Sequence, residues 1–209
     1  AAVPLCVELI ALEQVVEQSA SGMAAITGRS LTEIFKSEQS GRVIPQRDHV
    51  LIGKERNDVG RPNDEGYPIR GIVKGGKLYL HNFEEDRWPG GNPETGYKDT
   101  DESPTKTAVL ATEGVPGNKH LFAASFGKLP ADLLFDLKSD PDCMTNLAGL
   151  VSFTDLKKQL FAELKQQGDP RILGNGRIFD QYAYGKASMR NYHDRIMRGE
   201  TIIKDKAAD

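Results

Sequence analysis

The feature that most constrains the fold is a pair of extended runs that meet at two glycines, in "YPIRGIVKGGKLYLHNF" from Tyr67 to Phe83. Both runs are rich in β-branched and aromatic residues, and a Gly-Gly pair between two such runs is a strong signal for a β-hairpin. The runs "DHVLIG" at 48–53 and "LLFDL" at 133–137 have the same composition. The sequence therefore predicts a hairpin and two further strands.

One helix is equally well marked. Ser152 followed by Asp155 resembles a capping box, and Gly168 with Asp169-Pro170 ends the helical pattern. Between these signals an apolar stripe recurs at helical spacing, at Phe153, Leu156, Leu160 and Leu164. We expect this stripe to face a core, because such a stripe on a globular helix normally packs on a sheet.

The other segments are less regular. Helical patterns are predicted near the start, where Leu5, Leu9, Leu12 and Val16 follow Pro4, and at 31–35. Residues 84–130 form a long excursion interrupted by Pro and Gly, with one short helix expected in "SPTKTAVLATEG". Loops of this length carry function or wrap another part of a protein. We expect 171–209 to be an extended tail over a surface.

Composition excludes several classes of partner. The 209 residues are 38% hydrophobic and 27% charged, with a net charge of −3, so the chain can bury a core but has no basic excess. We therefore expect neither nucleic acid nor membrane as a partner, and no apolar run is long enough to span a bilayer. The chain starts at Ala1 without methionine and enters a helical pattern almost at once, which indicates a piece of a longer protein.

Motifs for catalysis are missing from the sequence. It has no nucleophile elbow, zinc pair, phosphate loop or dinucleotide fingerprint. The two cysteines, Cys6 and Cys143, stand in unrelated contexts and are expected to be ordinary thiols. The four histidines share no ligand-like spacing, so each is interpreted as a surface or hydrogen-bonded residue. His49 is the one of interest, because it precedes an arginine-rich loop.

That loop, "GKERNDVGRPNDEGYPIR" at 53–70, carries Arg56, Arg61 and Arg70. A guanidinium offers a planar fork of donors that matches sulfate, phosphate or carboxylate, so three arginines on one loop could converge on an anion. Acidic residues alternate with them, however, and mixed charge of this kind is also typical of a solvated loop with weak surface pairs. Both interpretations remain open from the residues alone.

The order of several segments resembles a known family. These are "TGRSL", then "RDHVLIGKERNDVGRPNDEGYPIRGIVKGGKLYLHNFEEDRWPGGNPETGYKDTDESPT", then "LLFDLKSDPDCMTNLA" with a helix after it. In this order and spacing they are similar to the carboxyl-terminal part of type I sulfatases, most of all the heparan N-sulfatases (N-sulfoglucosamine sulfohydrolases). The resemblance runs from about Leu5 to beyond "DPRILGNGRIFDQY".

The resemblance implies an α+β fold in which the hairpin and 133–137 join a small antiparallel sheet with the helix packed on it. Residues 1–53 would be the remnant of an α/β catalytic domain of the alkaline-phosphatase type. Residues 54–170 would form the carboxyl-terminal subdomain, and 171–209 the tail. A location in the periplasm, outside the cell or in lysosomes is what the family implies.

Family members cleave sulfate esters or sulfamates with a formylglycine beside a calcium ion. Both belong to the amino-terminal domain, which would be the missing partner of this chain. Cys6 is followed by "VELI" and Cys143 by "MTNL", so the formylglycine motif is absent here. The parent protein is thus expected to be a sulfatase, and this chain alone to be inactive, with no metal or cofactor of its own.

For the site, the resemblance implies that the loop at 55–70 lies near the mouth of the sulfate pocket. We expect four of its side chains to contact a sulfated sugar, with Glu55 and His49 orienting them. The four are Arg56, Asn57, Arg61 and Arg70.

The chain departs from the family at three positions. Asn57 stands where relatives have a histidine, so a group that could donate or shuttle a proton is replaced by an amide that cannot titrate. Phe135 and Cys143 also differ from the usual residues and are interpreted as structural drift.

Three alternatives remain from the sequence. The chain could be a free-standing module that binds sulfated polysaccharide without catalysis. It could be a fragment of a related phosphoesterase, which would use a serine or threonine with two metals. It could also be an inert fragment whose sheet exposes an apolar face.

Overall fold

The computed structural model describes residues 30–56, 59–181 and 189–201, so the helix expected near Leu5 and the side chain of Asn57 lie outside the described residues. The chain divides into two units, Ala1–Asp48 and His49–Asp209. The described part of the first unit holds one short helix, α2 (Thr32–Lys36), where a helical segment was expected at 31–35. The unit boundary falls before the first strand, which pairs within the second unit.

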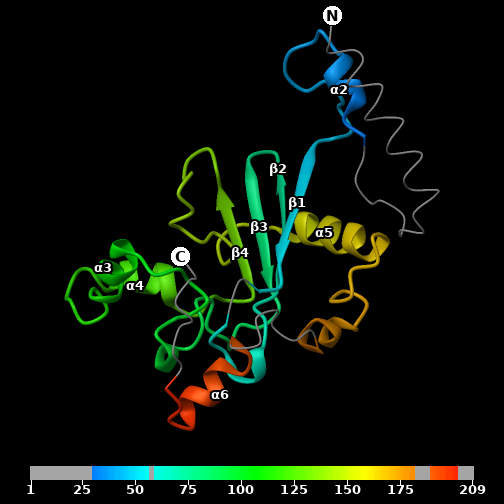
Figure 1. Cartoon of the computed structure of the whole chain (residues 1–209). Coiled ribbons are helices and arrows are strands. Elements are labelled where there is room, and N and C mark those ends of the chain that lie inside the picture. The colour runs from blue at the N-terminus through cyan, green and yellow to red at the C-terminus, as the bar shows by residue number, and fades with distance from the viewer. Residues whose placement is uncertain (1–29, 57–58, 182–188, 202–209) are drawn as a thin grey trace, which may run out of the picture. The chain divides into compact units, whose positions relative to one another are not determined.

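The second unit is built on a four-stranded antiparallel sheet of order β1-β2-β3-β4 (Figure 1). Its strands are β1 (His49–Lys54), β2 (Ile69–Lys74), β3 (Lys77–Asn82) and β4 (Asp132–Asp136). The predicted hairpin is confirmed: β2 and β3 meet at Gly75 and Gly76, whose φ angles of 57° and 76° suit the tight turns that favour glycine. The unit is therefore a mixed helix and sheet structure, as an α+β fold requires.

Helix α5 (Thr154–Gln166) covers one face of this sheet. Its predicted stripe is confirmed, since Leu160 and Leu164 are buried against Ile72, Tyr79 and Leu134 of the sheet. The predicted capping box is wrong, because the N-cap residue is Phe153 and no side chain caps the helix. Packing sets this end of the helix instead: the Phe153 ring stacks on Tyr79 with centroids 5.1 Å apart.

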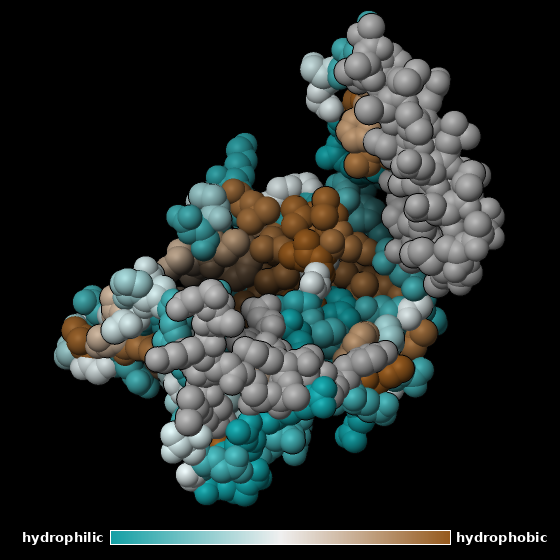
Figure 2. Space-filling model, viewed as in Figure 1, coloured by the Kyte–Doolittle hydropathy of each residue, from teal (hydrophilic) through white to brown (hydrophobic). Residues whose placement is uncertain are grey.

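The other face of the sheet is apolar and partly open to solvent. Val50 is 61% exposed and Ile52 41% exposed on β1, although both are strand residues with branched apolar side chains. The strand register places half-buried Val73, Leu78 and Leu80 beside them on the same face. Figure 2 shows a patch of hydrophobic residues, coloured brown, over the strands. We call this surface the open sheet face.

The excursion between β3 and β4 contains more regular structure than its sequence predicts. Besides the 3-10 turn η2 (Pro93–Thr95), it forms α3 (Pro104–Leu110) and α4 (Lys119–Phe126). The expected short helix is α3, whose N-cap Ser103 accepts a hydrogen bond from the Lys106 backbone at 3.0 Å. Sequence reasoning missed α4, which is held by a local cluster of Tyr97, Phe122 and Phe126.

The segment after Arg171, which was expected to be an extended tail, includes the 3-10 helix η3 (Gly176–Gln181) and α6 (Tyr192–Met197). Helix α6 packs on the 3-10 turn η1 (Pro62–Asp64). Two backbone amides make this contact: Asn63 donates to Asp194 Oδ2 at 3.1 Å, and Asn191 donates to Asp64 Oδ2 at 2.7 Å.

Candidate anion-binding pocket

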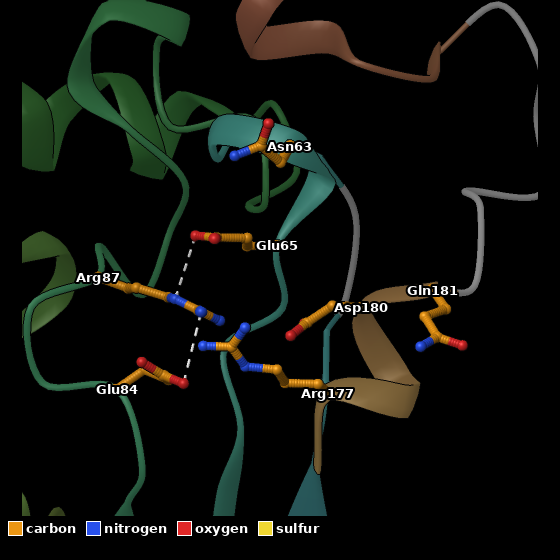
Figure 3. Close-up of a pocket in the computed structure, with 7 residues that line it drawn as sticks. All are labelled: Asn63, Glu65, Glu84, Arg87, Arg177, Asp180 and Gln181. Atoms are coloured by element: carbon orange, nitrogen blue, oxygen red, sulfur yellow. Dashed lines mark ion pairs between the residues drawn. The ribbon is translucent and has the colours of Figure 1, made fainter. Parts of the chain in front are cut away.

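A charged pocket opens where three segments of the second unit meet (Figure 3). Its volume of about 470 Å³ lies within the range of small-molecule sites. The side chains come from η1 and the residue after it, from the turn after β3, and from η3. They are Asn63, Glu65, Glu84, Arg87, Arg177, Asp180 and Gln181. We call it the η1–η3 pocket.

The η1 wall of the pocket is held in an unusual backbone conformation. Asn63 and Asp64 have φ angles of 54° and 53°, in the left-handed region that only a few non-glycine residues tolerate, Asn and Asp among them. The contacts with α6 described above stabilise this conformation from outside. The sequence Pro-Asn-Asp thus forms a rim of the pocket that presents Asn63 and, two residues later, Glu65.

Arg87 lies on one side of the pocket, and its guanidinium group already contacts other residues of the chain. Its Nη1 donates to the carbonyl of Gly66 at 2.9 Å. Its Nε lies 3.3 Å from Glu65 Oε2 and its Nη2 lies 3.4 Å from Glu84 Oε1. Arg87 with these two carboxylates therefore carries a net negative charge and holds the wall in place.

Arg177 and Asp180 are different, because they have spare hydrogen-bonding capacity. Among the described residues, none forms a hydrogen bond or an ion pair with Arg177. Asp180 accepts no hydrogen bond from the described part of the chain, and its nearest cation, Arg171 Nη2, is 3.8 Å from Oδ1. Figure 3 shows the guanidinium and the carboxylate pointing into the same space, on the side of Arg87. The pocket thus presents to a ligand one guanidinium without a partner among the described residues and one carboxylate that accepts no hydrogen bond and has only a 3.8 Å ion pair.

A network behind η3 positions this wall. Glu55, at the end of β1, accepts from Arg70 Nη2 at 2.5 Å and from Arg171 Nη2 at 2.8 Å. Arg70 also donates from Nε to Asp169 Oδ2 at 2.8 Å. Burial alone would lower the pKa of Arg70, but its hydrogen bonds to Asp169 and Glu55 outweigh this and raise it. One carboxylate therefore links the sheet to the chain that leads into η3.

The structure gives Arg61 an interior position. Its side chain is 2% exposed and its Nη2 donates to Asp99 Oδ2 at 2.5 Å. Its other donors reach the carbonyls of Glu65 at 3.0 Å and Trp88 at 3.3 Å. Burial lowers the pKa of Arg61, with Asp99 opposing this shift, but an arginine remains charged. Because its side chain is almost fully buried, Arg61 supports the loop from within.

The remaining expected site residues are spread over two places. Arg56 lies near the pocket, with Nη2 donating to the carbonyl of Phe179 in η3 at 3.3 Å. His49 lies on the α5 side of the sheet, with Nε2 2.6 Å from Glu163 Oε2. The structure therefore brings Glu55, Arg56 and Arg70 towards η3, while Arg61 and His49 lie elsewhere.

Sequence reasoning did not single out Arg87, Arg177 or Asp180. Arg177 and Asp180 belong to the segment taken for a tail, and no motif marks them. Their place in a pocket depends on η3 folding back beside η1, about 115 residues earlier in the chain. The only signal in the sequence is that the two charged residues lie three positions apart, and this spacing is too common in proteins to indicate a site.

No described residue offers an activated nucleophile at the pocket. Cys143 is a free thiol outside the pocket, and burial together with Asp140 and Asp142 raises its pKa, which keeps it protonated and unreactive. The interpretation of the histidines as hydrogen-bonded residues is confirmed. Partners are Glu163 for His49, Asp132 for His81, the Gly117 carbonyl for His120 and Glu94 for His193.

The comparisons with known proteins add no family: no protein-family model matches the chain, and no curated protein matches it significantly. Calcium takes six to eight oxygen ligands, yet within the described ranges no three His, Cys, Asp or Glu side chains gather as a metal site. Nor does any described helix combine the length and apolar character needed to cross a membrane.

Proposed function

We propose that this chain is the carboxyl-terminal part of a sulfatase that acts on sulfated sugars of the N-sulfoglucosamine type. In this proposal the four-stranded sheet with α5 is the sulfatase carboxyl-terminal subdomain. The chain contributes a sugar-binding pocket, while the formylglycine, the calcium ion and the catalytic chemistry belong to an amino-terminal domain that this chain lacks. By itself the chain binds ligand without turning it over.

The observation that carries the proposal is the free guanidinium of Arg177. A sulfate or sulfamate presents three oxygens to a planar fork of donors, and a pair of this kind is stronger than a neutral hydrogen bond. Carboxylates and side-chain amides around Arg177 match the hydroxyl groups of a sugar. This wall is supported by three residues of the loop that was expected to contact the sugar. Arg56 bonds to η3 itself, and Glu55 links Arg70 to Arg171, just before η3.

The open sheet face supports the proposal that an amino-terminal domain packs on this chain. Strand residues such as Val50 and Ile52 normally lie under a second layer, because burying apolar side chains stabilises a sheet by about 25 cal/mol for each Å² removed from water. In the proposal the catalytic domain provides that layer.

The test is ligand binding by the purified 209-residue chain. We expect N-sulfoglucosamine to bind, measured by calorimetry, and Arg177→Gln to weaken binding by about 10- to 100-fold, because a hydrogen bond to a charged group contributes about 1.5–3 kcal/mol. The matched control is Arg198→Gln, which removes an arginine that is 61% exposed and bonded to Glu200. This control should bind like the parent chain.

Three results would contradict the proposal. They are an Arg177→Gln chain that binds as well as the parent, a parent chain that does not bind sulfated sugar at millimolar concentration, and hydrolysis of an aryl sulfate by the chain alone. Salt-sensitive retention on heparin that is unchanged in Arg177→Gln would instead favour the polysaccharide-binding module, since long polyanions bind to distributed surface cations.

A further inference from the structure

We propose that the η1–η3 pocket prefers a sulfated sugar whose amine is free and protonated, that is, a zwitterionic amino sugar such as glucosamine 6-sulfate. This inference rests on the proposed function, because it assumes a sulfated sugar as the ligand. It adds the charge of the nitrogen to the properties that the pocket recognises.

The lining of the pocket carries more negative than positive charge. Three carboxylates, Glu65, Glu84 and Asp180, face two guanidinium groups, Arg87 and Arg177. Arg87 lies between Glu65 and Glu84, so the groups with spare hydrogen-bonding capacity are Arg177 and Asp180, the latter with Arg171 at 3.8 Å. After Arg177 takes a sulfate, the remaining charge of the lining is negative. A second group on the ligand is then most stable as a cation.

The carboxylate of Asp180 lies in a partly buried environment with few hydrogen-bond donors. Its Oδ1 is buried without a hydrogen bond, and its side chain is 25% exposed, so the carboxylate is largely removed from water but still reachable from the pocket. Arg171 lies nearby at 3.8 Å, but it already donates twice to Glu55. A partly buried carboxylate with an incomplete set of donors favours an ammonium group over a hydroxyl, because the charged donor offsets more of its desolvation.

The proposed reaction changes the charge of the sugar nitrogen. Hydrolysis of a sulfamate breaks the S–N bond of R–NH–SO₃⁻ with one water to release sulfate and R–NH₃⁺, so that atoms and charge balance. The nitrogen of the sugar therefore changes from an uncharged group beside an anion into a cation. A pocket with a guanidinium for one sulfate and a carboxylate for an ammonium fits the product of this step when the sugar keeps a second sulfate.

The experiment compares ligands that differ only at the nitrogen. The 209-residue chain is titrated by calorimetry with glucosamine 6-sulfate, N-acetylglucosamine 6-sulfate and glucosamine. We expect glucosamine 6-sulfate to bind about 10-fold or more tightly than the N-acetyl sugar, from one charge-assisted bond. The preference should disappear as the pH rises above the pKa of the sugar amine. Because this series uses the parent chain, it does not depend on the folding of a variant.

Two variants assign the preference to residues. Asp180→Asn keeps the shape of the side chain, and it should reduce binding of glucosamine 6-sulfate to the level of the N-acetyl sugar. Arg177→Gln should weaken both sulfated ligands to a similar extent while leaving the ratio between them unchanged.

The outcomes separate the two proposals. Equal affinity for the amine and the N-acetyl sugar overturns the zwitterion preference and leaves the proposed function standing. Binding of unsulfated glucosamine as tightly as its 6-sulfate contradicts the proposed function while retaining the amine contact. Absence of binding by all three ligands overturns both.

Discussion

Breaking the buried pair of Arg61 and Asp99 should destabilise the chain more than breaking an exposed surface pair. Their side chains are 2% and 0% exposed, and the guanidinium Nη2 lies 2.5 Å from the carboxylate. Replacing Asp99 with Asn removes the charge but keeps the shape, which leaves a buried cation without its counter-ion. Breaking a buried pair in this way costs about 3–5 kcal/mol. We expect about 3 kcal/mol for Asp99→Asn, because Arg61 keeps its two carbonyl acceptors.

Urea unfolding followed by tryptophan fluorescence measures this directly. Trp88 is the single tryptophan of the chain, and its carbonyl accepts from Arg61, so the signal reports on the same region. With a slope of about 2 kcal/mol per molar urea, a loss of about 3 kcal/mol lowers the midpoint by roughly 1.5 M.

The matched control is Glu200→Gln, which changes a 43% exposed side chain that pairs with Arg195 and Arg198 at the surface. This change should cost less than about 1 kcal/mol. A cost below about 1 kcal/mol for Asp99→Asn, indistinguishable from this control, would refute the reasoning.

Two further predictions concern α6 and the sheet. The pKa of His193 is raised, because its hydrogen bonds to Glu94 and Asp194 outweigh the effect of burial, so the protonated ring stabilises the fold below its ordinary pKa and this contribution is lost as the pH rises through the raised value. The urea midpoint of the parent chain should therefore fall towards that of His193→Gln as the pH rises from the ordinary pKa of histidine, about 6.5, through the raised value, and a constant gap would contradict the assignment. Gly71→Ala should lower the thermal midpoint by the equivalent of about 1–3 kcal/mol, because its Cβ would lie 2.5 Å from Leu80 Cδ2, whereas Gly114→Ala, with nothing within 4 Å, should not.

The regular part of the fold could be predicted from the sequence because its signals are local. Gly75 and Gly76 mark a turn whose conformation depends on the two residues themselves, and the stripe ending at Leu164 repeats with the period of a helix. Helix α4 escaped prediction because only Phe122 and Phe126 of its residues are buried, too few to produce a clear stripe.

The candidate site was harder to predict, because the partners of each charge are distant in the chain. Arg61 meets a carboxylate 38 residues away, and Arg70 meets one 99 residues away. An arginine in a loop has the same appearance in the sequence whether or not it is paired. Composition therefore could not separate Arg61, which is buried and paired with Asp99, from Arg177, which has no hydrogen-bond or ion-pair partner among the described residues. Glu55 was expected to orient side chains that contact a sugar, and its partners Arg70 and Arg171 became visible only in the folded chain.

The shared carboxylate of Glu55 has a consequence for how tightly the pocket could hold a ligand. By joining Arg70 of the sheet to Arg171 beside η3, it ties that wall of the pocket to the strand behind it. The conformational entropy of ordering the wall is then lost when the chain folds, so an incoming sugar meets a preorganised surface and retains more of its interaction energy as affinity.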